Sequence, residues 1–574
     1  MMKRIVFVVS VLSIIIGTLS AQTIGKHGTQ TKIIAQNGYY RSSRTAPNSM
    51  EAFLTAGKFG SYAATCEVVF TSDNQLVVMD QPEGKKITLT NESFKHLLEK
   101  NHRVALLDEF LARYEKSVNV SKETKSKALA KGELDNLMKD PMKLILVIGE
   151  VDAKLMPSML SVLGKSLKEV GDMPIVELSS YSLPVCIALR QKFPQMSITY
   201  LKGDLSPREL QKKTGKLGCA YDIKTLSANR NWVAEAHERN MLVMAVGVSD
   251  ESETKEALKT GADRILTDNV AMVSAWAQNK PLVKLMSFNI RMSGMPDVDG
   301  DNAWPKRKEA VVKMIGTENP DVFGVQEMLP DQQKYLRQEL HGYSMVGVGR
   351  DDGLMEGECM GIFFKNDRFT LLDSGTFWLS QTPEKATMGW DAACKRTVTY
   401  VQLKDIRSGK AFYYFNTHLD HVGMIARQES VKLICSEIRK LVRDTNSVFI
   451  LGGDMNSNMK DPIFAPLIGE REKAPQPVVA IKSENASAKI SGAGVPNHAP
   501  NAKGKSLMKS CRETSWETDN MATYNAYGKG RTAQIDHLFS SQKTENLVFQ
   551  TVRKNYGVPF ISDHYPVTLI FSLK

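Results

Sequence analysis

Residues 30–278 alternate short runs of β-branched and apolar residues with stretches whose apolar residues recur at helical spacing. Runs such as KLILVIGEV, MPIVELSS and NMLVMAVGVS predict strands, and stretches such as SMLSVLGKSLKEV and DESETKEALKTG predict helices. Strands that alternate with helices pair in parallel, because each helix returns the chain to the start of the next strand. With this many units, the pattern predicts a closed (β/α)8 TIM barrel.

The pattern changes after Asn279-Lys280-Pro281, where a terminal helix gives way to a new strand. In residues 282–574 the predicted strands, such as VKLMSFNI and SVFILGGD, are longer, and helices intervene less regularly. Two sheets packed together and flanked by helices account for this pattern better than a second barrel does. Residues 471–515 are rich in Lys, Ala, Ser, Asn, Pro and Gly and lack periodicity, which predicts a long surface insertion.

The amino terminus predicts an export signal over residues 1–21. Lys3-Arg4 precedes an apolar run that ends at Leu19, and the small residues Ser20 and Ala21 follow. No later segment is apolar enough to cross a bilayer. We therefore expect a mature chain without a membrane span, exported to the periplasm or the extracellular space. Its seven cysteines form no CxxC pair, so neither a zinc site nor a dense disulfide framework is indicated.

The formal charge of +11 and the pI near 9.0 would favour anionic partners such as phosphate esters, nucleic acid or an anionic membrane. Over 574 residues this excess is also compatible with an ordinary solvated surface. The length exceeds that of a single core and predicts at least two domains. Composition alone therefore does not identify a binding partner, and the sequence motifs have to be considered.

Carboxylates, amides and histidines follow the strands predicted in the second half. These residues are Asn289, Glu327, His418, Asp420, Asp454, Asn456, Asp536, Asp563 and His564. One polar residue after a strand is usually a turn or a cap, but here several sets follow one another in order. Gathered at one edge of a sheet, they would form an oxygen-rich site suited to a hard cation such as Mg²⁺.

In this order, the motifs of residues 282–574 resemble those of the endonuclease/exonuclease/phosphatase superfamily. The segments GRDDG, TFWLS, GWDAACKRT and NTHLDH look most like its secreted bacterial members. The resemblance implies a four-layer αββα sandwich and metal-dependent hydrolysis of phosphate esters by in-line attack of water. Members act on DNA, RNA, sphingomyelin and inositol phosphates, so the fold does not choose a substrate.

The same resemblance implies a role for individual residues. Glu327 and Asp563 would bind the cation, which would be Mg²⁺ or Mn²⁺. The catalytic residues would be His418, Asp454, Asn456, Asp536 and His564. The phosphate would be contacted by Asn289, Arg396, His418 and Asn456. Where many nuclease members carry an acid two positions after the first Asn, this chain has Arg291, which leaves the number of metal ions open.

The first half resembles glycerophosphodiester phosphodiesterases over about residues 30–276, in the segments IIAQNG, APNSMEAF, CEVVFTSDNQLVVMD and TGADRILTDN. Four functional positions of that family are replaced, at Gln36, Thr65, Met79 and Val147. Gln and Met cannot exchange protons near neutral pH, and Glu67 and Asp80 alone are too few ligands for a firm metal site. We therefore expect a catalytically inactive barrel.

Three functions follow from these patterns. The leading one is an exported, divalent-metal-dependent phosphoesterase whose active site lies in residues 282–574. The alternatives are a glycerophosphodiester phosphodiesterase that acts through the barrel and a non-catalytic binding protein for a phosphorylated headgroup. The expected substrate is a small phosphoester or a phospholipid headgroup, with nucleic acid and the oligomeric state left open.

Overall fold

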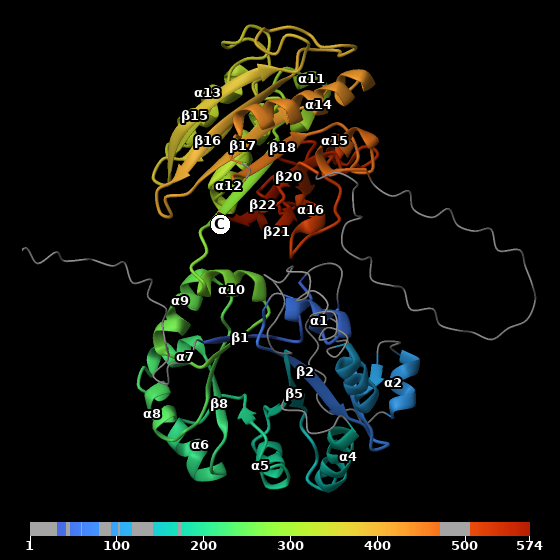
Figure 1. The fold of residues 1–574 in the computed structure, drawn as a ribbon, viewed down its shortest axis with the longest axis vertical. Helices are drawn as coiled ribbons and strands as arrows, with labels where there is room; N and C mark the ends of the chain where they lie inside the picture. Colours follow the sequence, from blue (N-terminus) through green and yellow to red (C-terminus); the bar gives the residue numbers. More distant parts are fainter. Residues whose placement is uncertain are drawn as a thin grey trace, which may run out of the picture. The chain divides into compact units, whose positions relative to one another are not determined.

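The computed structural model describes residues 31–573 except for 42–45, 59, 80–92, 101–103, 118–141, 170–174, 445 and 471–505. The described residues form two compact units, one containing Ala46–Ala277 and the other Gln278–Lys574 (Figure 1). The expected export signal, Asp80 and most of the expected insertion lie outside the described residues. Within the described part of the chain, no helix combines the length and hydropathy that a bilayer span requires.

Eight parallel strands close into a barrel in the first unit, because β1 pairs with both β2 and β10. In barrel order they are β1 (Lys32–Ala35), β2 (Ala63–Phe70), β5 (Lys143–Ile148), β6 (Val176–Ser180), β7 (Ile198–Tyr200), β8 (Gly218–Asp222), β9 (Val243–Val246) and β10 (Arg264–Thr267). Two antiparallel strands, β3 (Leu76–Met79) and β4 (Val104–Leu106), extend the sheet from β2. Buried aliphatic side chains such as Ile34, Ile145 and Met244 form one core cluster. The predicted TIM barrel is confirmed.

Helices follow most of the barrel strands, as the alternating pattern predicts. They are α1 (Met50–Lys58), α2 (Phe94–Lys100), α4 (Met156–Glu169), α5 (Leu183–Lys192), α6 (Pro207–Thr214), α7 (Ile223–Ala228), α8 (Trp232–Glu238), α9 (Glu251–Thr260) and α10 (Val270–Ala277). Several begin where the sequence supplies a cap: the Ser206 side chain accepts a hydrogen bond from the backbone N–H of Glu209 at the start of α6. Polar turn residues thus begin the helices that cover the barrel strands.

The second unit contains two six-stranded mixed sheets. In spatial order, the first is β13 (Tyr343–Val346), β14 (Ile362–Lys365), β12 (Val322–Gln326), β11 (Leu282–Asn289), β22 (Val567–Ser572) and β21 (Glu545–Thr551). The second is β15 (Phe369–Trp378), β16 (Thr397–Asp405), β17 (Ala411–His418), β18 (Val448–Asp454), β20 (Asp536–Ser541) and β19 (Met508–Ser510). Helical segments are α11 (Pro296–Asp299), η1 (Gly300–Asn302), α12 (Trp304–Glu318), α13 (Pro330–Glu339), α14 (Met424–Leu441), η2 (Pro462–Phe464), α15 (Ala465–Ile468), α16 (Cys511–Thr514) and η3 (Ala526–Gly528).

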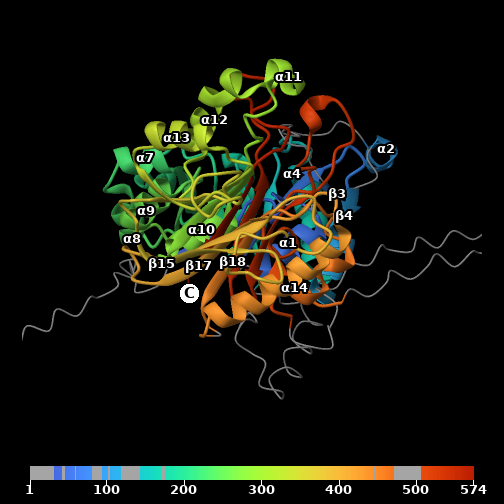
Figure 2. The same cartoon turned by 90° about the horizontal axis from the view of Figure 1, so that it is seen from above.

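The two sheets pack face to face through one apolar cluster, in which Leu285 and Phe364 of the first sheet meet Leu403 and Ile450 of the second. Separate clusters join α12 and α13 to the outer face of the first sheet, and α14 and α15 to that of the second. Figure 2 shows α12 and α13 on one side of the strands and α14 on the other. The predicted four-layer αββα sandwich is confirmed.

One boundary of the expected insertion is wrong. Residues 508–514 belong to the folded sandwich, because β19 pairs with β20 and α16 follows it directly. Met508 and Cys511 are fully buried, so this stretch contributes to the core although its sequence lacks a clear period. The expected surface insertion therefore extends too far at its carboxyl end.

Candidate functional site

The polar residues predicted from the second half meet at one edge of the sandwich. Strands β11, β12, β17 and β18 end there, and β20 begins there. The register places Asn289 beside Gln326, His418 beside Asp454, and Asp454 beside Asp536. This alignment brings carboxylates and histidines that are far apart in the sequence onto neighbouring strand ends.

His564 lies between two buried carboxylates. Its Nδ1 is 2.8 Å from Asp536 Oδ2, and its Nε2 is 3.6 Å from Asp454 Oδ2. Burial by itself would lower the pKa of His564, but Asp536 and Asp454 raise it to about 10. The imidazole is therefore protonated at neutral pH, which makes it a hydrogen-bond donor and a fixed positive charge.

The pKa of Asp454 is also shifted, but toward neutrality. Burial raises the pKa of this carboxyl group to about 7, with Asp536 adding to the shift and His564 opposing it. The backbone N–H of Asn456 donates to Asp454 Oδ1 at 2.9 Å, and Asn289 Nδ2 donates to Oδ2 at 3.0 Å. A carboxylate with a pKa near neutrality, held by two donors, is suited to accept a proton from water.

Asn289 connects this pair to Glu327. Its Nδ2 donates to Glu327 Oε1 at 2.9 Å and also to Asp454, which belongs to the other sheet. The backbone N–H of Met292 donates to Glu327 Oε2 at 3.1 Å. Glu327 adopts φ 61°, a left-handed conformation that is uncommon for a side chain of this size and that often marks functional sites.

Glu327 and Asp563 are the two carboxylates that the sequence predicts to bind a divalent cation. Burial raises the pKa of Asp563, and the negative charge of Glu327 raises it further. Two acids that repel each other in a largely buried place match the donor chemistry of Mg²⁺ or Mn²⁺. The residues expected to hold the cation therefore fit such an ion.

Two other groups of side chains come close enough together to suggest a metal site. One is Asp454, Asp536 and His564, in which His564 Nδ1 and Asp536 Oδ2 already form a hydrogen bond of 2.8 Å. The other is Cys394, Asp420 and His421. There, the Asp420 carboxylate already accepts hydrogen bonds from three backbone N–H groups, which makes it a structural anchor.

His418 is buried and neutral. Burial lowers its pKa well below the ordinary value, and the positive charges of Arg396 and His564 lower it further. Asn456 Nδ2 lies 3.0 Å from His418 Nε2 and also donates to a backbone carbonyl, so Nε2 is the acceptor and the imidazole proton lies on Nδ1. That Nδ1 is 3.9 Å from Glu358 Oε2. Glu358 was not predicted from the sequence.

Arg396 is the predicted phosphate contact with a spare donor. Its Nε lies 3.4 Å from Asp420 Oδ2, and its Nη2 is 3.0 Å from His421 Nδ1. Its Nη1 is buried, lies 3.8 Å from Glu358, and has no hydrogen-bond partner among the described residues. Arg350, also missed from the sequence, donates to Glu358 at 2.6 Å. A phosphoryl oxygen would satisfy the free Arg396 donor.

Arg291 is a second fixed cation at this edge. Its guanidinium binds Asp299, with Nη2–Oδ1 3.0 Å, and its Nη1 lies 3.9 Å from Glu327. Its partial burial opposes the charged form, but Asp299, Asp563 and Glu327 raise the pKa of Arg291. The position that carries an acid in many nuclease relatives thus carries a cation fixed by a buried partner.

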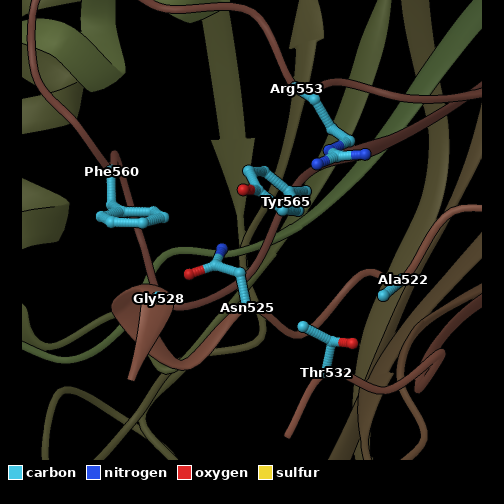
Figure 3. A pocket seen from close by; sticks show the side chains of 7 residues that line it. All are labelled: Ala522, Asn525, Gly528, Thr532, Arg553, Phe560 and Tyr565. Carbon is cyan, nitrogen blue, oxygen red and sulfur yellow. The ribbon is translucent and has the colours of Figure 1, made fainter. Parts of the chain in front are cut away.

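An open cavity of about 270 Å³ borders the segment that carries Asp563 and His564 (Figure 3). Tyr565 follows His564 directly, and Arg553 stacks over its ring at 5.3 Å. One residue that lines the cavity contacts the site directly, because the backbone N–H of Asn525 donates to the Asp563 carbonyl at 2.7 Å. The lining residues are Ala522, Asn525, Gly528, Thr532, Arg553, Phe560 and Tyr565.

The barrel has a different set of groups at its corresponding strand ends. The backbone N–H of Asn37 donates to Thr65 Oγ1 at 2.8 Å, and its side chain lies 3.5 Å from Glu67. The Asn48 amide bridges the Glu67 N–H and the Met79 carbonyl. These are mostly neutral amide and hydroxyl contacts.

Two family models match separate parts of the chain. The model of the Endonuclease/Exonuclease/phosphatase family matches residues 286–564. The model of the Glycerophosphoryl diester phosphodiesterase family matches residues 38–272. Each match covers most of one unit.

Solved structures similar to the chain also divide between the two units. An endonuclease/exonuclease/phosphatase from Bacteroides vulgatus is 29% identical, covers 51% of this chain and 100% of its own, and has a TM-score of 0.43. A mannosyl-6-phosphatase from Bacteroides thetaiotaomicron is 26% identical, with 50% and 99% covered and a TM-score of 0.41. A glycerophosphodiester phosphodiesterase from Parabacteroides distasonis is 23% identical, with 43% and 97% covered and a TM-score of 0.36.

Proposed function

Because residues 286–564 belong to the endonuclease/exonuclease/phosphatase family and residues 38–272 to the glycerophosphoryl diester phosphodiesterase family, we propose that this chain is an exported, divalent-metal-dependent phosphoesterase. Its active site is the edge of the sandwich. The observation that carries the proposal is the double hydrogen bond of Asn289, which joins Glu327 to Asp454 across the two sheets. The expected cation ligand and the expected base thereby become parts of one network.

The roles of Asp454 and His564 follow from their protonation. Asp454 accepts the proton of the attacking water, since its pKa of about 7 lies near working pH. His564 is already an imidazolium and donates to a phosphoryl oxygen, which stabilises the charge that develops during in-line attack. The environment of His564 therefore favours stabilisation of the phosphate over proton abstraction from water. Asp536 keeps it charged and oriented.

Glu327 and Asp563 would hold the divalent cation, Mg²⁺ or Mn²⁺, which when bound neutralises phosphoryl charge and favours attack by water. Arg396 adds a donor to the phosphate through its free Nη1. The Asn456 Nδ2 group donates to His418 and to the Leu419 carbonyl, which fixes the amide and leaves its oxygen to accept a hydrogen bond from the attacking water. These groups orient the phosphate against the water activated by Asp454.

The barrel contributes no catalysis in this proposal. The position expected to carry a proton-transferring histidine is Gln36, and the neighbouring contacts of Asn37 and Thr65 involve groups that do not titrate near neutral pH. A catalytic barrel and a non-catalytic binding protein are the two alternatives that an experiment must separate. Fold alone does not decide among these functions.

The test is a screen for hydrolysis products, identified by phosphorus NMR, with the full chain over phospholipids, glycerophosphodiesters, sugar and inositol phosphates and nucleic acids, with Mg²⁺ or with EDTA. We expect Mg²⁺-stimulated turnover that falls about 10²- to 10⁴-fold in His564→Ala. The matched control is His237→Ala, which removes a buried, Asp263-paired histidine from the barrel. Turnover that survives His564→Ala but is lost when Glu67 is changed to Gln would place the chemistry in the barrel. Turnover of no substrate would support a binding protein.

A further inference from the structure

Exposed apolar side chains gather around the candidate site. In the described part of the second unit, nine of the twelve large apolar side chains that are exposed lie on loops, in α11 or in the first turn of α14, at the edge that carries the site. Six belong to three loops beside His418 or to the first turn of α14, which follows the third loop, and we call them the apolar rim. They are Leu354, Met355, Met388, Val422, Met424 and Ile425.

The three loops are fixed to one another. The first contains residues 347–358, the second residues 379–396 and the third residues 419–423, which lead into α14. Lys395 Nζ of the second loop donates to the Asp351 carbonyl of the first at 2.7 Å. Asp391 of the second loop accepts a hydrogen bond from Ala426 N at 2.6 Å, at the start of the helix that follows the third loop. The apolar side chains therefore stand on one connected support.

That support also holds the phosphate-binding groups. The second loop ends at Arg396. The first loop carries Arg350, which donates to Glu358, and Glu358 lies 3.8 Å from Arg396 and 3.9 Å from His418. The backbone N–H of Ala393 and the Arg396 guanidinium both donate to Asp420 on the third loop. A ligand whose phosphate reaches Arg396 would therefore lie beside the loops that carry the rim.

The exposure of these side chains is large enough to require an explanation. Leu354 is 71% exposed, Met424 73% and Val422 61%. Isolated apolar residues on a surface are ordinary, but a cluster around a binding site marks an apolar ligand or partner. Methionine, which supplies three of the six, adapts to flexible chains of varied shape.

The charges on the same loops exclude a polyanion. Although the whole chain carries a formal charge of +11, the exposed charges of these loops are predominantly acidic. A nucleic-acid backbone that crossed these loops would be repelled by their exposed carboxylates. The exposed acids are Asp351, Asp352, Glu356, Glu384 and Asp391.

We propose that the apolar rim binds the hydrocarbon part of an amphiphilic phosphoester whose phosphate occupies the neighbouring site. This inference rests on the proposed function and names its substrate class. A single phosphate pairs with Arg396 and His564, the hydrocarbon chain covers the rim, and the acidic loops favour a neutral or cationic headgroup over a polyanion.

The test compares two phosphodiesters with one headgroup, dihexanoylphosphatidylcholine below its micelle concentration and glycerophosphocholine, which lacks the acyl chains. Calorimetric binding to the full chain carrying His564→Ala, with Mg²⁺ present, avoids turnover. We expect the acylated ligand to bind at least about 10-fold more tightly, since one fully buried methylene contributes about fourfold. Adding Leu354→Asp and Met424→Asp should remove this preference.

The control is Leu371→Asp with Leu372→Asp, the same chemical change at exposed residues of β15, which should keep the preference. Equal binding of the two ligands, or a preference that survives the rim changes, would overturn the inference. Turnover of soluble phosphoesters with no chain-length preference would keep the proposed hydrolysis and reject the rim. A preference without turnover in the unmutated chain would keep the rim and reject the hydrolysis.

Discussion

The barrel and the sandwich both place polar side chains where parallel strands end, but the two places differ in chemistry. At the barrel ends, Asn37 and Thr65 bond each other, and Glu67 is the acid beside them. At the sandwich edge, Asp454 and His564 lie 3.6 Å apart and their pKa values are shifted in ways that suit proton transfer and charge stabilisation. An architecture that can present a site is thus distinct from groups that can perform a reaction.

The strongest test of this comparison replaces one acidic side chain in each unit by its neutral amide. Asp454→Asn removes the proton acceptor and should lower turnover about 10²- to 10⁴-fold, because an amide cannot take a proton from water. Glu67→Gln, the matched change in the barrel, should leave turnover within about twofold. Steady-state formation of hydrolysis product by the full chain measures both. The reverse pattern would assign catalysis to the barrel.

Each unit also contains a buried arginine, and these two should differ in what they support. Arg307 donates to the carbonyls of Asn302, Ile290, Arg291 and Ile561, and so ties the end of β11 to the segment that precedes Asp563. Its replacement by Met should cost about 3–5 kcal/mol of unfolding free energy and also reduce turnover, because the carbonyls lose their donors.

Arg264 in the barrel provides the control for that change. Its guanidinium donates twice to Glu177, at 2.6 and 3.1 Å, at the end of the strands opposite the barrel mouth. Arg264→Met should cost about 3–5 kcal/mol as well, since it leaves a buried carboxylate with fewer partners, but turnover should not change. Urea unfolding and formation of hydrolysis product on the same samples test this. Loss of activity in both variants would mean that the units depend on each other.

The fold was largely readable because strand and helix periods are local properties of the sequence. Two strands have weak local signals, since β8 (Gly218–Asp222) is short and begins with glycine, and the mostly half-buried β13 lacks the apolar run of a core strand. The stretch 508–514 was taken for insertion because its three-residue strand gains burial only by pairing with β20. In each case tertiary contacts, not local pattern, fix the element.

The site was predictable where each group follows a recognisable strand, as Glu327 and Asp454 do. Glu358 and Arg350 were missed because they lie in an irregular loop, and only folding brings them to His418, about sixty residues further along. The sequence signal for Glu358 is a charged residue that follows a glycine, in GEC, ahead of an apolar strand. This pattern is too short to be specific. Roles that depend on protonation could not be predicted, because burial and neighbouring charge set the pKa values.

The dependence of turnover on pH tests the different roles proposed for Asp454 and His564. Turnover should rise as Asp454 loses its proton near pH 7 and fall as His564 loses its own near pH 10. Asp536 raises both pKa values, so Asp536→Asn should move both limbs toward lower pH by about one unit. Initial rates from pH 5 to 11 define the rising and falling parts of the profile. If Asp536→Asn moved these two parts away from each other, the roles assigned to Asp454 and His564 would be contradicted.

The same linkage fixes the sign of a stability effect. Because the folded-state pKa of His564 is raised, its contribution to folding is fully present below its unfolded pKa of about 6.5 and is lost as pH rises through about 10. Asp536→Asn should therefore destabilise the chain less at pH 10 than at pH 6. Urea midpoints at the two pH values measure the difference, and a larger loss at pH 10 would reverse the sign.

The smallest expected effect concerns the cation that stands where many relatives carry an acid. Arg291 lies 3.9 Å from Glu327, so its charge opposes a divalent ion held by Glu327 and Asp563. Arg291→Gln should tighten Mn²⁺ binding about 3- to 10-fold by calorimetry, whereas Arg553→Gln, a change outside this cluster, should not alter it. Weaker binding in Arg291→Gln would show that the guanidinium, fixed by Asp299, is needed to hold Glu327 in its left-handed backbone conformation. Its role would then be to build the cation site rather than to compete with the ion.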